Sequence, residues 1–230
     1  MISEDILKEI RAIFGKKWST REGRQVPEAE NISLGNEAVT LSGTVLYADM
    51  ADSTGLVNGF RPWFAAEVYK AYLLGACRVI RHQGGDITAF DGDRVMAVFL
   101  GESKNTAAVK AALQINYLIA KTNEMLRAAY PTTVYTLRQS VGIDTSNLFV
   151  ARTGIRNAND LVWVGRAANY AAKLSALGEE GYPTYITDDV FTRLNEQTKF
   201  GGQDKKPMWE KRTWTERQMT VHRSSWWWQI

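Results

Sequence analysis

The spacing of apolar residues divides the chain into a short amphipathic beginning and a long regular remainder. Residues 1–18 predict a helix, because isoleucines recur in them at helical spacing. Residues 19–36 are rich in Ser, Thr, Gly, Pro and charged residues, which is typical of a linker. We therefore expect an N-terminal helix and linker arm over 1–36, and one regular catalytic or binding domain over 37–230.

The polar face of the predicted first helix carries charges of both signs. This mixture disfavours docking on a membrane surface, where basic residues prevail. We expect its apolar face, which includes Ile2, Ile6, Ile10 and Phe14, to pack on the domain or on a second subunit.

From residue 42 onward, the pattern predicts a succession of strands and helices. Strands are expected at 42–50, 86–91, 94–100, 134–144, 147–153, 161–164, 183–187, 207–214 and 218–229. Helices are expected at 55–83, 103–129, 166–177 and 188–197, with Pro62 tolerated in the first of them, a turn at Thr145–Asn147 and a loop at 154–160. The order βαββαβ with C-terminal additions predicts an α+β, ferredoxin-like palm, that is, a mostly antiparallel sheet with helices on one face.

Composition excludes several classes of protein. The 230 residues are 45% hydrophobic, enough for a full-sized core, and the net charge of +3 is too small to indicate a nucleic-acid partner. The single cysteine, Cys77, cannot form an internal disulfide. No apolar run is long enough to cross a bilayer and no signal-peptide core is present, so we expect a cytoplasmic protein without a membrane partner.

Two aspartates at strand ends are the strongest chemical signal. Asp49 closes the apolar run Val45–Ala48, and Asp93 opens another run after a tight Asp-Gly turn. An acid at the end of a buried strand is costly unless it is solvated, paired or bound to a cation. Two such carboxylates suit Mg²⁺, which fills its remaining positions with water and phosphate oxygens. Two surface acids in turns are the alternative.

The segment after Asp49 begins a helix. Asp52 is expected to cap that helix. The backbone amides of Met50 to Thr54 would then be free to bind phosphate.

A polar stripe follows Gly165. Arg166, Asn169 and Lys173 are three and four residues apart, so they share one face of the predicted helix, and alanines between them suggest close packing. Such a stripe could orient a ribose and neutralise charge at an attacked phosphate. A solvated helix face is the alternative.

Two residues beside the aspartates are candidates for contacting a base. Tyr47 lies two residues before Asp49 and so points to the same face of the strand, and Arg94 follows Asp93 directly. A core tyrosine and a solvated arginine are the alternative readings.

Four motifs in order resemble those of class III nucleotidyl cyclases. They are Leu46-Tyr-Ala-Asp-Met-Ala-Asp-Ser-Thr54, Gly92-Asp-Arg-Val-Met-Ala-Val-Phe99, Ser140-Val-Gly-Ile-Asp-Thr145 and Val164-Gly-Arg-Ala-Ala-Asn-Tyr-Ala-Ala-Lys-Leu174. The resemblance implies a head-to-tail homodimer with its active sites between the subunits. It also implies two Mg²⁺ or Mn²⁺ ions on Asp49, Asp93 and the Met50 backbone carbonyl, and substrate contacts from Ala51, Asp52, Ser53 and Thr54.

Three positions depart from the family pattern. Ala89 and Val162 stand where the family has its purine-reading residues, and neither side chain can hydrogen-bond a base. Lys173 stands where the family has arginine and supplies charge without a bidentate fork. A changed base preference, a silent nucleotide-binding dimer and a purine cyclase that reads its base through backbone groups all remain open.

The loss of purine readers beside an intact acid pair favours a pyrimidine substrate. The chain is similar to the small pyrimidine cyclases of bacterial Pycsar antiphage systems, particularly over residues 159–174. That similarity implies conversion of UTP, or alternatively CTP, to the 3′,5′-cyclic monophosphate and pyrophosphate. The product would act as a second messenger in antiviral defence, through a separate effector protein.

Overall fold

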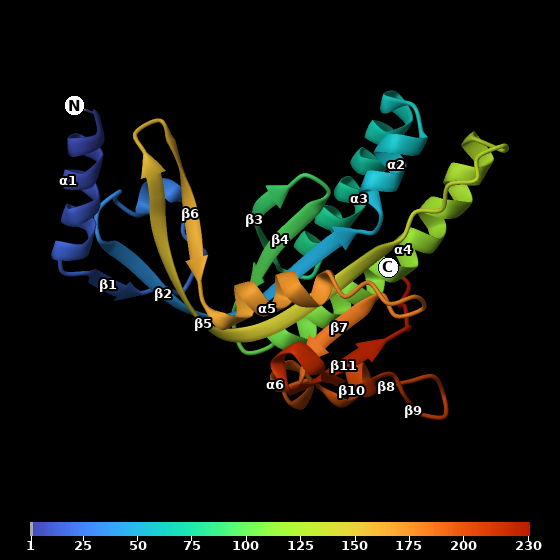
Figure 1. Ribbon diagram of the computed structural model, residues 1–230. Coiled ribbons are helices and arrows are strands. Elements are labelled where there is room, and N and C mark those ends of the chain that lie inside the picture. Colours follow the sequence, from blue (N-terminus) through green and yellow to red (C-terminus); the bar gives the residue numbers. More distant parts are fainter. Residues whose placement is uncertain (1) are drawn as a thin grey trace.

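A computed structural model describes residues 2–230 of the chain (Figure 1). The helices are α1 (Ile2–Gly15), α2 (Ser53–Gly59), α3 (Pro62–His82), α4 (Lys104–Ala129), α5 (Arg166–Ser175), α6 (Asp188–Thr192) and α7 (Glu196–Lys199). The strands are β1 (Ser19–Glu22), β2 (Glu37–Met50), β3 (Asp86–Asp91), β4 (Arg94–Phe99), β5 (Gln139–Ile155), β6 (Ala158–Val164), β7 (Thr184–Thr187), β8 (Phe200–Gly201), β9 (Lys206–Pro207), β10 (Glu210–Trp214) and β11 (Met219–Ser224).

One large sheet organises the molecule. Its main path runs β10-β11-β7-β5-β2-β4-β3, with β1 added beside β2 and β6 beside β5. The long β2 strand lies antiparallel to both β4 and β5. The elements β2, α2–α3, β3, β4, α4 and β5 therefore form the predicted βαββαβ palm, and the α+β fold class is confirmed.

Helices cover the two faces of the sheet unequally. Alternate residues of β2 point to opposite faces. Leu46 and Ala48 join α3 and α4 in the larger core cluster, whereas Val45 joins a second cluster that contains alanines of α5. The expectation that helices lie on one face holds for α3 and α4, and α5 lies on the other. That second face also carries Asp49.

The region between residues 134 and 164 differs most from expectation. No turn forms at Thr145–Asn147, because these residues pair in register with Ser42–Thr44 of β2 and the strand continues to Ile155. The reversal falls instead at Asn157, which has a φ of 67°. Residues expected as a loop at 154–160 thus form a β5–β6 hairpin. Asparagine tolerates the left-handed region better than most residues.

Other boundaries also move. The helix expected over 55–83 is broken into α2 and α3, because Pro62 occupies the first turn of α3 and Arg61 before it is extended. The helix expected over 188–197 becomes two short ones, α6 and α7. The arm at 19–36 contains β1, which pairs in parallel with β2.

The N-terminal helix is formed but not covered. None of the residues of α1 is buried, so it does not pack on the domain. Figure 1 places it at one end of the molecule beside the β5–β6 hairpin, far from α3 and α4. Among residues 2–230, no helix is both long and apolar enough to cross a membrane.

Candidate active site

Strand pairing brings the two predicted metal aspartates to the same end of neighbouring strands. Asp49 pairs directly with Arg94 across β2 and β4, and Asp93 precedes Arg94 at the hairpin turn. Burial, followed by the negative charge of Asp93, raises the pKa of Asp49 to about 6. The two carboxylates therefore lie close together in a partly desolvated site, and a bound cation would relieve the repulsion between them.

The donor set fits a magnesium-type ion. No group of three or more His, Cys, Asp or Glu residues gathers as a metal site within residues 2–230. Two carboxylates and the Met50 carbonyl match an ion that retains waters and phosphate oxygens in its shell. An ion that requires a complete protein cage would not suit it.

Arg94 is already engaged by a neighbouring acid. Its guanidinium donates to Asp91, and this hydrogen bond is the main cause of the raised pKa of Arg94. Tyr47 is half-buried on the same face of the sheet, and burial raises its pKa. Both residues lie beside Asp49, as their sequence positions predicted, and their roles in base recognition remain predictions.

The turn after Asp49 confirms the predicted cap. Asp52 adopts a left-handed conformation and accepts a hydrogen bond of 3.1 Å from the Gly55 amide. The Ala51 amide donates to the Arg138 carbonyl at 2.9 Å. The amides of Ser53 and Thr54 remain available, because the first turn of a helix offers its amides no partner.

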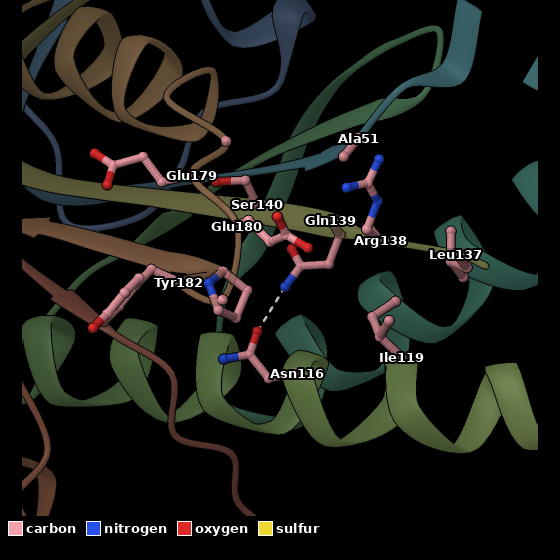
Figure 2. A pocket seen from close by; sticks show the side chains of 13 residues that line it. Ala51, Asn116, Ile119, Leu137, Arg138, Gln139, Ser140, Glu179, Glu180 and Tyr182 are labelled. Carbon is pink, nitrogen blue, oxygen red and sulfur yellow. Dashed lines mark hydrogen bonds between the residues drawn. The ribbon is translucent and has the colours of Figure 1, made fainter. Parts of the chain in front are cut away.

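Arg138 is a cation that the sequence analysis missed. Its side chain is exposed, and Figure 2 shows its guanidinium beside Ala51, at the edge of a cavity of about 190 Å³. The cavity is lined by neither Asp49 nor Asp93, so it adjoins the acid pair without enclosing it. The missed signal was position, since Arg138 directly precedes β5, the strand that pairs with β2.

Helix α5 packs tightly on the second face of the sheet. Ala167, Ala168 and Ala171 are buried against it. Gly142 of β5 permits this approach, because a Cβ atom at that position would lie 2.1 Å from the Ala171 carbonyl oxygen. Asn169 and Lys173 consequently project outward and are exposed.

Arg166 differs from the other two residues of the predicted stripe. It forms an ion pair of 3.0 Å with the fully buried Asp144 and another with Asp189, and it donates to the Thr145 carbonyl at 2.9 Å. Its charge is therefore balanced within the chain. Its expected action on a phosphate together with Asn169 and Lys173 stays a prediction.

The two positions that lack purine readers lie in different surroundings. Ala89 of β3 is half-buried against the second core cluster. Val162 of β6 is 39% exposed, whereas its neighbours Leu161 and Trp163 point to the opposite face and pack against the second core cluster. Both are apolar in the structure as well as in the sequence.

A buried hydroxyl near the acid pair was also missed. Tyr72 of α3 is fully buried, and its hydroxyl has no hydrogen-bond partner in the described chain. Burial raises its pKa well above the usual value, and the negative charges of Asp49 and Asp93 add to the effect. The sequence analysis did not single it out.

Comparison with solved structures identifies the fold. The adenylyl cyclase CyaB from P. aeruginosa matches with a TM-score of 0.70 and 20% identity, covering 82% of this chain and 95% of that one. A bacterial light-regulated adenylyl cyclase matches with a TM-score of 0.68 and 20% identity, covering 80% and 90%. The fold is that of class III nucleotidyl cyclases, with the acid pair at the predicted strand ends.

No protein-family model matches the chain. Comparison with curated proteins nevertheless shows the family to which the chain belongs. A uridylate cyclase of Xanthomonas perforans is 48% identical over 224 residues, which is 95% of this chain and 94% of that protein. A uridylate cyclase of Burkholderia cepacia is 45% identical over 232 residues, covering 100% and 99%. The chain belongs to the uridylate cyclase family.

Proposed function

We propose that this chain converts UTP into 3′,5′-cyclic UMP and pyrophosphate, in a homodimer whose active sites lie between the subunits. The observation that carries the proposal is full-length similarity to uridylate cyclases, joined to a like-charged pair, Asp49 and Asp93, at the strand ends of a cyclase fold. Similarity at this level covers the whole chain rather than an isolated motif.

The reaction joins the ribose 3′-oxygen to the α-phosphorus. The bond from that phosphorus to the β-phosphate oxygen breaks, the 3′-hydroxyl proton is lost, and pyrophosphate leaves. Divalent ions on Asp49, Asp93 and the Met50 carbonyl would acidify the hydroxyl and neutralise the triphosphate. The Ser53 and Thr54 amides in the first turn of α2 would hold the leaving phosphates together with the guanidinium of Arg138, which lies beside Ala51.

The other half of the chemistry comes from a second subunit. Asn169 and Lys173 are exposed on α5, and no hydrogen bond or ion pair joins them to Asp49 or Asp93 within the described chain. In a head-to-tail dimer they would face the partner's acid pair, with Asn169 orienting the ribose and Lys173 stabilising charge on the α-phosphate. Arg166 instead anchors α5 to the sheet.

The preference for a uracil base follows from two features: the absence of purine-reading side chains, and two polar side chains beside Asp49. Ala89 and Val162 offer no hydrogen bond to a purine. Tyr47 and Arg94 present a hydroxyl and a guanidinium near Asp49, and Arg94 can donate to carbonyl oxygens such as those of uracil. This arrangement supports UTP ahead of CTP.

The direct test offers ATP, GTP, CTP and UTP separately with Mn²⁺ and identifies the products by mass. We expect cyclic UMP from UTP, and no product with Asp49→Asn. Preference for ATP or GTP would show that the chain is a purine cyclase. Tight UTP binding without turnover in Mg²⁺ or Mn²⁺ would indicate a silent nucleotide-binding dimer.

Sharing of the site has its own test. Asp49→Ala and Asn169→Ala variants, each inactive alone, are mixed in equal amounts and allowed to exchange subunits. Half of the dimers become mixed, each with one intact site, so activity should return to about a quarter of wild type. No recovery after proven exchange would mean that each chain builds its own site.

The role in antiviral defence is a further proposal that rests on resemblance alone. It predicts that cells carrying the chain with its effector accumulate cyclic UMP after phage infection. An unchanged cyclic UMP level during an otherwise productive defence would contradict it.

A further inference from the structure

The end of the molecule formed by α1 and the β5–β6 hairpin carries an uncovered apolar surface. Large apolar residues are exposed at seven positions between residues 2 and 18, namely Ile2, Ile6, Leu7, Ile10, Ile13, Phe14 and Trp18. In α1 these residues gather on one side of the helix, and charged residues occupy the other. Stable monomers rarely expose a contiguous patch of this kind.

The C-terminal end of the helix is anchored to the rest of the chain. The Asn36 side chain donates to the carbonyls of Ile13 and Lys16, at 2.8 Å each, and so fixes the C-terminal end of α1. A helix of this length is marginal in water without packing of its apolar side. The structure thus directs α1 outward, and a partner is needed to cover it.

The apolar surface continues onto the hairpin. Trp18 contacts Phe149 edge to face, with ring centroids 5.0 Å apart. Phe149 pairs in register with Val164, so their side chains share one face of the sheet, and Val162 lies two residues along on that face. Val162 and Val164 are both exposed. We call the set of α1, Trp18, Phe149, Val162 and Val164 the N-terminal surface.

We propose that a second copy of this chain covers the N-terminal surface, so that α1 is an arm of the dimer. Two other occupants are disfavoured. The chain's own domain leaves α1 without a buried residue, and Asp5 and Glu9 beside Lys8 and Arg11 do not suit an anionic membrane. The proposal rests on the proposed function, because β6 leads through Gly165 into α5, whose Asn169 and Lys173 would face the partner.

The test compares dimer dissociation constants by sedimentation velocity over a range of concentrations, without nucleotide. Ile6→Glu/Ile10→Glu and, separately, Val164→Glu should weaken the dimer by at least about tenfold. Met125→Glu, which alters an apolar residue 71% exposed on α4, is the matched control and should change the constant less than about twofold. All variants should keep their melting temperature at high concentration, because the altered side chains are already exposed in the single chain.

A second measurement follows the helix itself. Amide hydrogen exchange in residues 2–15 should be slow at concentrations where the wild type is dimeric and fast where it is monomeric. Exchange that is fast at both concentrations, or a dimer constant unchanged by both α1 and hairpin variants, would overturn the proposal. Wild-type binding to phosphatidylserine vesicles, lost in Ile6→Glu/Ile10→Glu while the dimer constant is unchanged, would assign the surface to a membrane instead.

Failure of this proposal and failure of the proposed function are separable. If wild type makes cyclic UMP and the variants dimerise normally, the surface has another role and the function stands. If wild type has no cyclase activity but dissociates when α1 is altered, the arm stands and the function fails. If both hold, the variants lose activity at low protein concentration and regain it at high concentration.

Discussion

Asp49 and Asp144 lie on neighbouring strands of one sheet, yet their surroundings are opposite. Asp144 is fully buried, paired with Arg166, and accepts a hydrogen bond of 2.6 Å from Thr187. Asp49 is half-buried, faces the negative charge of Asp93, and has a pKa raised to about 6. Burial alone therefore does not distinguish structure from function. The charge of Asp144 is compensated by a cation, whereas the charge of Asp49 meets the like charge of Asp93 and only part of that effect is offset by Arg94.

The largest expected effect comes from removing the uncompensated charge. Asp49→Asn should lower cyclic UMP formation by on the order of 10³-fold, because the ion-binding site loses a carboxylate. The same change should raise the melting temperature of the metal-free protein at pH 7.5, since like-charge repulsion is relieved. Asp86→Asn, at an exposed position on β3, is the control and should alter neither. Lower stability together with full activity would contradict the contrast with Asp144.

Removing the compensated pair should act on stability instead. Arg166→Ala leaves the buried Asp144 without its cation and should cost about 3 kcal/mol or more in the free energy of unfolding, measured with urea. Arg193→Ala, which removes only an exposed partner of Asp189, should cost under about 1 kcal/mol. If Arg166→Ala folds normally but turns over UTP 10²-fold more slowly, then Arg166 acts in catalysis, as the sequence had suggested.

Lys173, which is exposed on α5, tests the proposed contribution of the second subunit to the site that contains Asp49. Lys173→Ala should lower kcat by about 10²-fold with little change in KM, because its charge acts on the transition state. Lys173→Arg should stay within about tenfold of wild type. Lys70→Ala, on the exposed side of α3, is the matched control. Equal turnover by all three variants would show that Lys173 is a solvated side chain without a role in catalysis.

The smallest expected effect is a dependence on pH. Asp49 has a pKa of about 6 in the fold, against an ordinary value of 3.8, so above pH 6 its ionised form opposes folding. Below pH 6 the folded state binds a proton that the unfolded state does not bind until lower pH. The gain in melting temperature from Asp49→Asn should therefore shrink between pH 6 and pH 4, and Mn²⁺ affinity of the wild type should fall over the same range. A gain independent of pH would mean that repulsion is not its source.

The sequence predicted those parts of the molecule that depend on local pattern. The strand carrying Asp49, the Asp-Gly hairpin before Arg94 and the cap at Asp52 are all where pattern placed them. Each requires only a run of apolar residues or a turn residue with a specific conformation.

The parts it missed depend on distant partners. Thr145–Asn147 has the composition of a turn, but pairing with β2 keeps it extended. Arg166 sits in a stripe with Asn169 and Lys173, yet it turns to Asp144, 22 residues earlier. Asp144 within an apolar strand was the available signal, because a buried acid needs a cation.

The absence of a side chain at Gly142 of β5, beneath α5, determines how the protein would respond to substitution at this position. Because Gly142 has no side chain, the backbone of α5 lies directly against the strand, and an added Cβ atom would lie 2.1 Å from the Ala171 carbonyl oxygen and 2.5 Å from the Ser175 nitrogen. Gly142→Ala would therefore push the helix away from the sheet and displace Asn169 and Lys173 with it. Under the proposed roles of these two residues, Gly142→Ala should lower activity although Gly142 brings no side chain to the proposed site.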